Sequence, residues 1–338
     1  MSESEFRVLV VGGGSIGERH VRCFQKTGRV EAMLCEIDDS TRERVCETYS
    51  LPFATNDLAA GLAENPGLVV ICTPAHLHIV QALQAAEAGA HLLIEKPLSV
   101  AEGGEDGIDA LVEVVTERGL FASIAYVYRA HPALAEIRAA LRSDRFGRPL
   151  QVTVQSGQHF PHYRPAYRET YYTRHETGGG AIQDALTHHV NAVEWLVGPT
   201  TSVAADAAHL VLEGVDVEDT VNVVARNGEV MTAYSMNQHQ APNQSTSTIV
   251  CERGTILFEG HHNGWSVATE PGEAWREQSR FELERDDLFV MQANRALDAI
   301  AGQSEPACSI EEARQTLRVN RALLRAARER CWVDIPCD

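Results

Sequence analysis

Short apolar runs alternate with amphipathic segments along the first third of the chain. Each run is rich in β-branched or aliphatic residues, and the segments between the runs have the apolar spacing of helices. Strands that alternate with helices are typical of βαβ units and a parallel sheet. We therefore predict an α/β domain with a doubly wound parallel sheet over residues 1–125. Its strands are expected at residues 6–11, 30–36, 68–74, 91–97 and 120–127.

The pattern changes after a helix predicted at residues 131–143. Apolar runs now follow one another closely, and Asn227-Gly228 and Arg253-Gly254 are typical of hairpin turns. Strands joined by tight turns form antiparallel sheets, so we predict a second domain over residues 126–338 with a mainly antiparallel sheet. Its strands are expected at residues 150–157, 220–236 and 246–260, and its final helices at about 286–301 and 309–328, the last of which can pack back on the first domain.

Composition limits the partners and the compartment. With 338 residues, of which 44% are hydrophobic, the chain can bury the cores of two domains. Its longest apolar runs fall far short of the roughly 18 residues that cross a bilayer, and its first residues do not resemble a secretion signal. Eight scattered cysteines without a CxxC pair favour a reducing cytoplasm, and a net charge of −18 disfavours nucleic acid. We expect a cytoplasmic protein that binds neither membranes nor nucleic acid.

A glycine-rich segment follows the first predicted strand and opens the first helix. The sequence GGGSIG matches the G-x-G-x-x-G pattern, in which the glycines permit a turn, a close approach to a pyrophosphate and close helix packing. Two alternatives are an ordinary tight turn and the adenosyl-cofactor loop of a methyltransferase. Position favours a dinucleotide, because Glu36 ends the next strand, where a carboxylate binds ribose hydroxyls and repels a 2′-phosphate. We predict NAD as the cofactor, with NADP possible, and contacts from Gly12, Gly14, Ser15, Ile16, Gly17 and Glu36.

The ends of the next two parallel strands are expected to complete the cofactor site, because ligands of such sheets collect at these ends. The Lys96 ammonium could bond a substrate hydroxyl and stabilise alkoxide character, although most lysines are simply exposed. His76 and His78 resemble a metal-binding pair, but residues two apart on a helix point in different directions, so no metal site is predicted. The expected cofactor contacts here are Thr73, Pro74, His78, Glu95 and Lys96.

A helix predicted after Gly178-Gly179-Gly180 carries an unusual polar face. Asp184, His188, Asn191 and Trp195 are four, three and four residues apart, opposite an apolar stripe. A carboxylate, an imidazole, an amide and an indole are typical of a polar pocket with an aromatic floor for a sugar ring. His188 could accept and return the hydroxyl proton, and Asp184 could orient it or bind a neighbouring hydroxyl. The alternative is a helix whose histidine is structural.

In their order and spacing, GGGSIG, CTPAHLH, EKP and the triple glycine followed by Asp184 and His188 resemble the glucose-fructose oxidoreductase and inositol dehydrogenase family (Gfo/Idh/MocA). The resemblance spans nearly the whole chain. It implies a Rossmann domain followed by an α/β domain on a large open sheet. The exposed face of that sheet commonly forms the subunit interface, so a homodimer or homotetramer is expected. It also implies hydride transfer between NAD(P) and a sugar, sugar derivative or cyclic polyol, with Lys96 and His188 catalytic, Asp184 in contact with substrate, and a cis Lys96-Pro97 peptide.

Two features bear on substrate choice. Many members of that family have aspartate where this chain has Asn191, so a charge is lost. The segment 158–177 is rich in arginine and tyrosine, and its Arg168 could bind an anionic group of the substrate. A subunit contact is the alternative for this segment. We predict Lys96, Arg168, Asp184, His188, Asn191 and Trp195 as substrate-binding residues.

The leading hypothesis is thus an NAD(P)-dependent dehydrogenase of a sugar, sugar derivative or cyclic polyol. A catalytically silent NAD(H)-binding sensor on the same fold is the alternative. The presence of Lys96, Asp184 and His188 argues against the sensor. A methyltransferase would leave the EKP turn and the second sheet without a role.

Overall fold

The computed structural model describes residues 6–100 and 107–336, which form two compact units. The N-terminal unit contains the chain up to Ala130 together with Glu284–Ala313. The C-terminal unit contains His131–Leu283 and the chain from Arg314 onward. The predicted boundary at 125/126 lies close to the first crossing. However, the predicted second domain is interrupted, because the next-to-last helix folds with the N-terminal unit.

The N-terminal unit is built on a six-stranded sheet in the order β3-β2-β1-β4-β5-β6, with every neighbouring pair parallel. This order confirms the predicted doubly wound sheet. The direction of winding reverses between β1 and β4, where ligands of such sheets bind at the carboxyl ends of the strands. The strands are β1 (Phe6–Val11), β2 (Val30–Cys35), β3 (Ala54–Thr55), β4 (Leu68–Ile71), β5 (His91–Ile94) and β6 (Ala122–Ile124).

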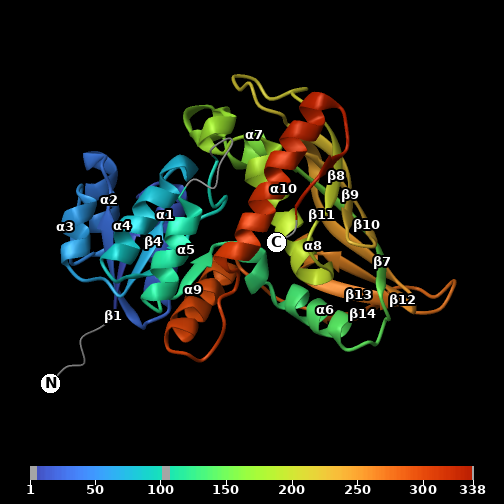
Figure 1. Cartoon of the computed structure of the whole chain (residues 1–338), viewed down its shortest axis with the longest axis horizontal. Helices are drawn as coiled ribbons and strands as arrows, with labels where there is room; N and C mark the ends of the chain where they lie inside the picture. Colours follow the sequence, from blue (N-terminus) through green and yellow to red (C-terminus); the bar gives the residue numbers. More distant parts are fainter. Residues whose placement is uncertain (1–5, 101–106, 337–338) are drawn as a thin grey trace. The chain divides into compact units, whose positions relative to one another are not determined.

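Helices surround this sheet (Figure 1). The residues of β4 are all buried, as expected for a parallel strand with both faces covered. The short strand β3 was not predicted, because two residues carry no periodic pattern. The helices are α1 (Ser15–Lys26), α2 (Asp39–Tyr49), α3 (Leu58–Ala63), η1 (Ala75–Leu77), α4 (His78–Glu87), α5 (Ile108–Glu117), η2 (Val127–Ala130) and α9 (Asp287–Ile300).

An ion cluster at the start of α9 holds this returning helix against α1. The Asp286 carboxylate accepts hydrogen bonds from Arg22 Nε at 2.6 Å and Nη2 at 3.0 Å, and Arg19 and Lys26 each lie 3.5 Å away. The guanidinium of Arg19 also lies 4.9 Å from the centre of the Phe289 ring. The bonds from Arg22 lower the pKa of Asp286 to about 2. The cluster therefore stabilises the fold while the carboxylate is ionised.

Replacing Asp286 by Asn should destabilise the N-terminal unit by about 2 kcal/mol at neutral pH, because three cations lose their carboxylate partner. The folded pKa lies below the ordinary 3.8. The difference in the free energy of unfolding between wild type and Asp286→Asn therefore has its full value above about pH 4 and vanishes as the pH falls towards 2. Urea unfolding at several pH values measures it. The matched control is Asp298→Asn, whose exposed pair with Arg29 is expected to contribute under about 1 kcal/mol. Equal losses in the two variants would contradict this assignment.

The C-terminal unit is built on a nine-stranded sheet in the order β14-β13-β12-β11-β7-β10-β9-β8-β15. Only β7 and β10 pair in parallel, so the prediction of a large, mainly antiparallel sheet is confirmed. Both predicted hairpins form, but each turn is shifted by one residue. The first turn is 228–229, one residue after the predicted Asn227-Gly228, and the second is 252–253, one residue before the predicted Arg253-Gly254. The strands are β7 (Pro149–His159), β8 (Ser202–Ala208), β9 (Thr220–Asn227), β10 (Val230–Asn237), β11 (His239–Cys251), β12 (Gly254–Glu259), β13 (Gly264–Ala268), β14 (Arg276–Arg280) and β15 (Val333–Asp334).

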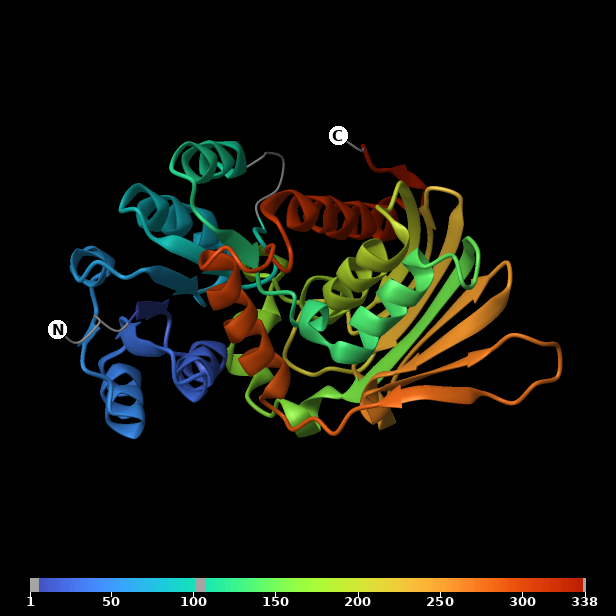
Figure 2. The same ribbon diagram turned by 90° about the horizontal axis from the view of Figure 1, so that it is seen from below.

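The two faces of this sheet differ. Helices α6 (Pro132–Arg142) and α8 (Thr187–Val197) pack on one face, and α10 (Ile310–Glu329) bonds to α8. Along β9 buried residues alternate with exposed ones, so every second side chain points away from these helices. No helix of the described residues covers that second face (Figure 2). It carries a groove of about 860 Å³ beside Trp332, with the exposed apolar side chains of Val224 and Met231 nearby.

Among the described helices, none combines the length and the apolar character needed to cross a bilayer.

Candidate active site

The glycine loop has the geometry of a phosphate cradle. Gly12 has a φ of +97°, and a Cβ there would lie 2.9 Å from the Cys72 carbonyl oxygen. A Cβ on Gly17 would lie only 1.8 Å from the Gly12 oxygen. At Gly14, by contrast, a Cβ would meet no atom within 4 Å, and no side chain caps the helix that begins at Ser15. The first and third glycines thus serve close packing, while the second leaves space at the N-terminus of α1, where a pyrophosphate binds.

Glu36 lies beside this loop. Its carboxylate accepts hydrogen bonds from the backbone N–H of Gly13 and, at 2.8 Å, of Asp38. Two arginines on α2 that could have attracted a 2′-phosphate already have carboxylate partners: Arg42 binds Asp39, and Arg44 lies 2.9 Å from Glu18. This arrangement fits NAD better than NADP.

The loops after β4 and β5 are tied together by a buried histidine. His78 is 1% exposed, with Nε2 2.8 Å from the Thr73 carbonyl and Nδ1 3.0 Å from the Pro97 carbonyl. Burial lowers the pKa of His78 below its ordinary value. The Lys96-Pro97 peptide is cis, as the family resemblance implied. His78 was predicted to contact the cofactor, whereas both of its ring nitrogens face protein carbonyls.

Glu95 is likewise buried, and its partner is a residue that the sequence analysis missed. Glu95 Oε1 lies 2.8 Å from His20 Nε2 on α1, and Oε2 accepts a hydrogen bond from the Lys96 N–H at 3.2 Å. The two side chains are 1% and 8% exposed. Glu95 therefore links α1 to the backbone of Lys96, and its predicted contact with the cofactor stays a prediction. The only sequence signal for His20 is its position one helical turn after Gly17.

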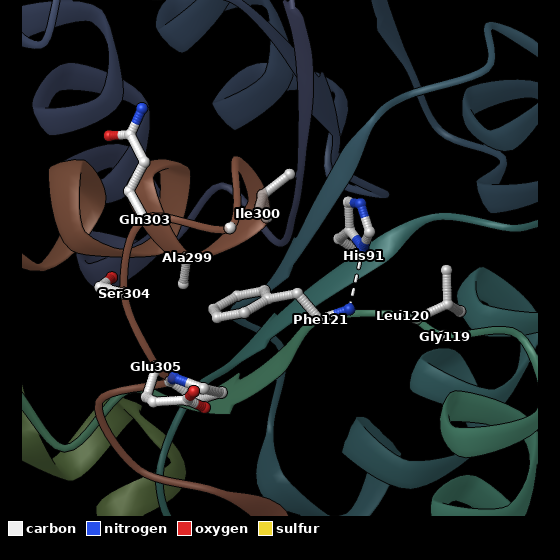
Figure 3. A pocket seen from close by; sticks show the side chains of 11 residues that line it. His91, Gly119, Leu120, Phe121, Ala299, Ile300, Gln303, Ser304 and Glu305 are labelled. Atoms are coloured by element: carbon white, nitrogen blue, oxygen red, sulfur yellow. Dashed lines mark hydrogen bonds between the residues drawn. The ribbon is translucent and has the colours of Figure 1, made fainter.

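A separate cavity of about 620 Å³ lies at the opposite edge of the same sheet, where β5 and β6 begin (Figure 3). There the Phe121 N–H donates to His91 Nδ1 at 2.9 Å. The cavity contains none of the predicted site residues, and it lies at the amino ends of the strands rather than at the carboxyl ends. We therefore do not assign it to the cofactor. It is lined by His91, Gly119, Leu120, Phe121, Ala299, Ile300, Gly302, Gln303, Ser304, Glu305 and Pro306.

In the C-terminal unit, the predicted polar helix does not begin as an α-helix. Ile182–Leu186 forms a π-helical turn, and α8 follows from Thr187. This wider turn breaks the regular spacing that was used to stack Asp184 under His188; π turns are frequent at functional sites. Both side chains are partly exposed, and Asp184 Oδ1 accepts a hydrogen bond of 2.7 Å from the Tyr171 hydroxyl.

The other two residues of the predicted polar face are buried in packing contacts. Asn191 is 1% exposed, and its amide donates to Thr316 Oγ1 on α10 at 3.0 Å. Trp195 is 9% exposed, and the Arg138 guanidinium lies 4.6 Å from its ring centre. Trp195 is thus packed inside the C-terminal unit, and its role as an aromatic floor stays a prediction. Of the four predicted residues, Asp184 and His188 are the two with partly exposed side chains. His189 is buried, which lowers its pKa to about 4, in agreement with a structural role.

Arg168 also has a protein partner. Its Nε donates to the Glu213 carbonyl at 2.8 Å, its Nη2 lies 3.4 Å from the Glu213 carboxylate, and its guanidinium lies over the ring of Tyr167. Arg168 was predicted to bind an anionic substrate; here it forms an exposed ion pair with Glu213, and the substrate contact stays a prediction. Within the described residues, no group of three or more His, Cys, Asp or Glu side chains is arranged to hold a metal ion.

Comparison with known proteins agrees with this geometry. Residues 6–126 match the family described as "Oxidoreductase family, NAD-binding Rossmann fold", and residues 134–257 match the "GFO/IDH/MocA C-terminal domain". Levoglucosan dehydrogenase from Pseudarthrobacter phenanthrenivorans is 25% identical, over 97% of this chain and 98% of the relative. UDP-N-acetylglucosamine 3-dehydrogenase from Acidithiobacillus ferrooxidans is 24% identical, over 92% and 94%.

Solved structures with the same fold include levoglucosan dehydrogenase in complex with NADH and levoglucosan, with a TM-score of 0.88 and 22% identity over 98% of this chain and 100% of that one. The WlbA dehydrogenase from Bordetella pertussis, in complex with NADH and UDP-GlcNAcA, has a TM-score of 0.82 and 26% identity over 99% and 100%. Because models of the two domains match in the expected order, the chain belongs to the Gfo/Idh/MocA family of oxidoreductases with an NAD-binding Rossmann domain.

Proposed function

We propose that this protein is an NAD-dependent dehydrogenase that transfers hydride to or from a hydroxyl-bearing carbon of a sugar, a sugar derivative or a cyclic polyol. The observation that carries the proposal is the arrangement at one edge of the parallel sheet. There the glycine cradle, Glu36 and the cis Lys96-Pro97 turn occupy the carboxyl ends of β1, β2 and β5. The family relatives named above, together with inositol 2-dehydrogenases, support this class of substrate. When bound, NAD supplies the hydride acceptor of the oxidation.

Three side chains are proposed to act on the substrate. The Lys96 ammonium donates a hydrogen bond to the reacting hydroxyl and stabilises its alkoxide character. His188 accepts the proton of that hydroxyl in oxidation and returns it in reduction. Asp184 accepts a hydrogen bond from a neighbouring hydroxyl. The Lys96 N–H donates a hydrogen bond to the Glu95 carboxylate, which fixes the backbone from which the Lys96 side chain extends.

Replacing Lys96 or His188 by Ala should lower kcat/KM by about 10²- to 10⁴-fold, because each removes a group that stabilises the transition state. NADH formation is measured on a panel of inositols, aldoses, sugar acids and nucleotide sugars, and NADH binding is measured separately by fluorescence. The sequence offers a matched control, because Lys26 is the only other lysine in the chain. Lys26→Ala should leave turnover unchanged. Turnover that survives Lys96→Ala would exclude the proposed role, and NADH binding without any turnover by the wild type would favour a sensor.

Replacing Glu36 by Gln should reduce the preference for NAD over NADP at least about tenfold in kcat/KM, because the repulsion of a 2′-phosphate is removed. Glu31→Gln is the control. It changes a carboxylate at the opposite end of the same strand, where Glu31 pairs with Arg7. A cofactor preference unchanged by Glu36→Gln would contradict the assignment of Glu36 to the ribose.

We also propose a homo-oligomer formed through the uncovered face of the nine-stranded sheet, and the cytoplasm as the compartment. The sheet face carries exposed apolar residues, including Val224 at 48% and Met231 at 46% exposure. Such patches mark interaction surfaces. The seven described cysteines are free, as expected in a reducing compartment.

The double variant Val224→Glu/Met231→Glu should dissociate the oligomer, because paired copies would bury unpaired carboxylates at the interface. Sedimentation velocity of wild type and variant measures the change in mass. Val80→Glu is the control, since Val80 is similarly exposed, at 52%, but lies on α4 of the N-terminal unit. If the double variant sediments as the wild type does, another surface must hold the oligomer.

A further inference from the structure

The triple glycine before the polar helix allows an unusually close approach of the preceding segment. A Cβ on Gly179 would lie 2.1 Å from the Tyr172 carbonyl oxygen. Gly180 has a φ of +91°, and a Cβ there would lie 2.6 Å from the carboxylate of Glu218. A side chain at position 179 would force the segment 171–174 away, whereas one at position 180 would displace Glu218. Gly179 is therefore required for the close approach of this segment to the start of the π-helical turn.

The segment has a small core of its own. The rings of Phe160 and Tyr172 lie 4.4 Å apart, and the Tyr167 hydroxyl donates to the Glu213 carbonyl at 2.8 Å. These contacts order the segment without help from a ligand. The cluster consists of Phe160, Tyr167, Tyr172, Leu212, Val215 and Val217.

Tyr171 stands on this core with its ring towards solvent. Its neighbour Tyr172 is 1% exposed, whereas Tyr171 is 43% exposed. The Thr177 hydroxyl donates to the Tyr171 carbonyl, which fixes the backbone. Part of the Tyr171 ring is therefore accessible to a ligand.

The hydroxyl of Tyr171 is directed at Asp184, to which it donates at 2.7 Å. A phenol oxygen and a carboxylate can each accept hydrogen bonds from more than one donor. A ligand group facing this pair is therefore best matched by a donor, such as a hydroxyl. A carboxylate or phosphate would instead meet the negative charge of Asp184. Arg168, the cation expected to attract such groups, is paired with Glu213.

We propose that Tyr171 determines specificity for a neutral, hydroxyl-bearing ring: its aromatic face packs on the C–H face of the substrate ring, and its hydroxyl orients Asp184 towards the ring's hydroxyls. Tyr171 thus takes the part that Trp195 was expected to have. This inference rests on the proposed function, since it assumes that Asp184 contacts the substrate.

The test uses the full-length enzyme, a neutral substrate from the panel that it turns over, and the corresponding sugar acid. Tyr171→Leu removes the ring and the hydroxyl, and Tyr171→Phe removes the hydroxyl alone. Tyr163→Leu is the control, because Tyr163 lies in the same segment and is 53% exposed. KM for the substrate, KM for NAD and kcat are measured for each variant, and NADH binding reports that each is folded.

We expect Tyr171→Leu to raise KM for the neutral substrate about tenfold, as expected for the loss of an aromatic contact, with KM for NAD within about twofold of wild type. Tyr171→Phe should give a smaller increase, and Tyr163→Leu none. The wild type should prefer the neutral substrate to its acid at least about tenfold.

Two results would overturn the inference and leave the proposed function intact: substrate KM values within about twofold of wild type for both Tyr171 variants, or a wild-type preference for the sugar acid. If Tyr171→Leu does not fold, Tyr171→Phe decides. A wild type that binds NADH but oxidises no member of the panel would instead refute the proposed function, and this inference with it.

Discussion

The architecture of the N-terminal unit depends on close backbone packing at the carboxyl edge of its parallel sheet. Gly17 approaches Gly12, and Gly12 approaches Cys72, at distances that no Cβ would permit. This packing sets the position of α1 relative to β1 and β4. One turn further along α1, His20 then meets Glu95 at the end of β5. The close packing of Gly12, Gly17 and Cys72 therefore also determines where Glu95, the residue before Lys96, finds its partner on α1.

Buried polar side chains extend that constraint across the site. His78 joins the loops after β4 and β5 through two carbonyls, and Glu95 holds the N–H of Lys96. Burying such groups is costly unless they find hydrogen-bond partners, so the bonds made by His78 and Glu95 favour one conformation of the turn. The two residues thus fix the backbone on either side of Lys96.

The C-terminal unit is also organised by close packing at a glycine and by hydrogen bonds between polar side chains. Gly179 permits the approach of the Tyr171 segment to the π-helical turn, and polar side chains hold the helix that follows. Glu194 on α8 accepts hydrogen bonds from Thr316 at 2.7 Å and from Gln315 at 3.2 Å, both on α10. Burial raises the pKa of this carboxyl group above its ordinary value, even though these bonds favour its charged form. Asn191 joins the same network through Thr316, which accounts for an amide at this buried position.

The sequence by itself determined the features that depend on neighbouring residues: the parallel sheet with its glycine cradle, the hairpins of the second sheet, and the places of Glu36, Lys96, Asp184 and His188 along the chain. These follow from side-chain periodicity and backbone sterics, which act over a few positions. Tertiary structure alone decided that α9 returns to the N-terminal unit, that His78 and Glu95 are buried, that Asn191 and Trp195 pack inside, and that Tyr171 reaches Asp184. Each of these outcomes depends on partners far away in sequence, and a side chain's exposure and hydrogen bonds are set by whichever distant residues fold against it.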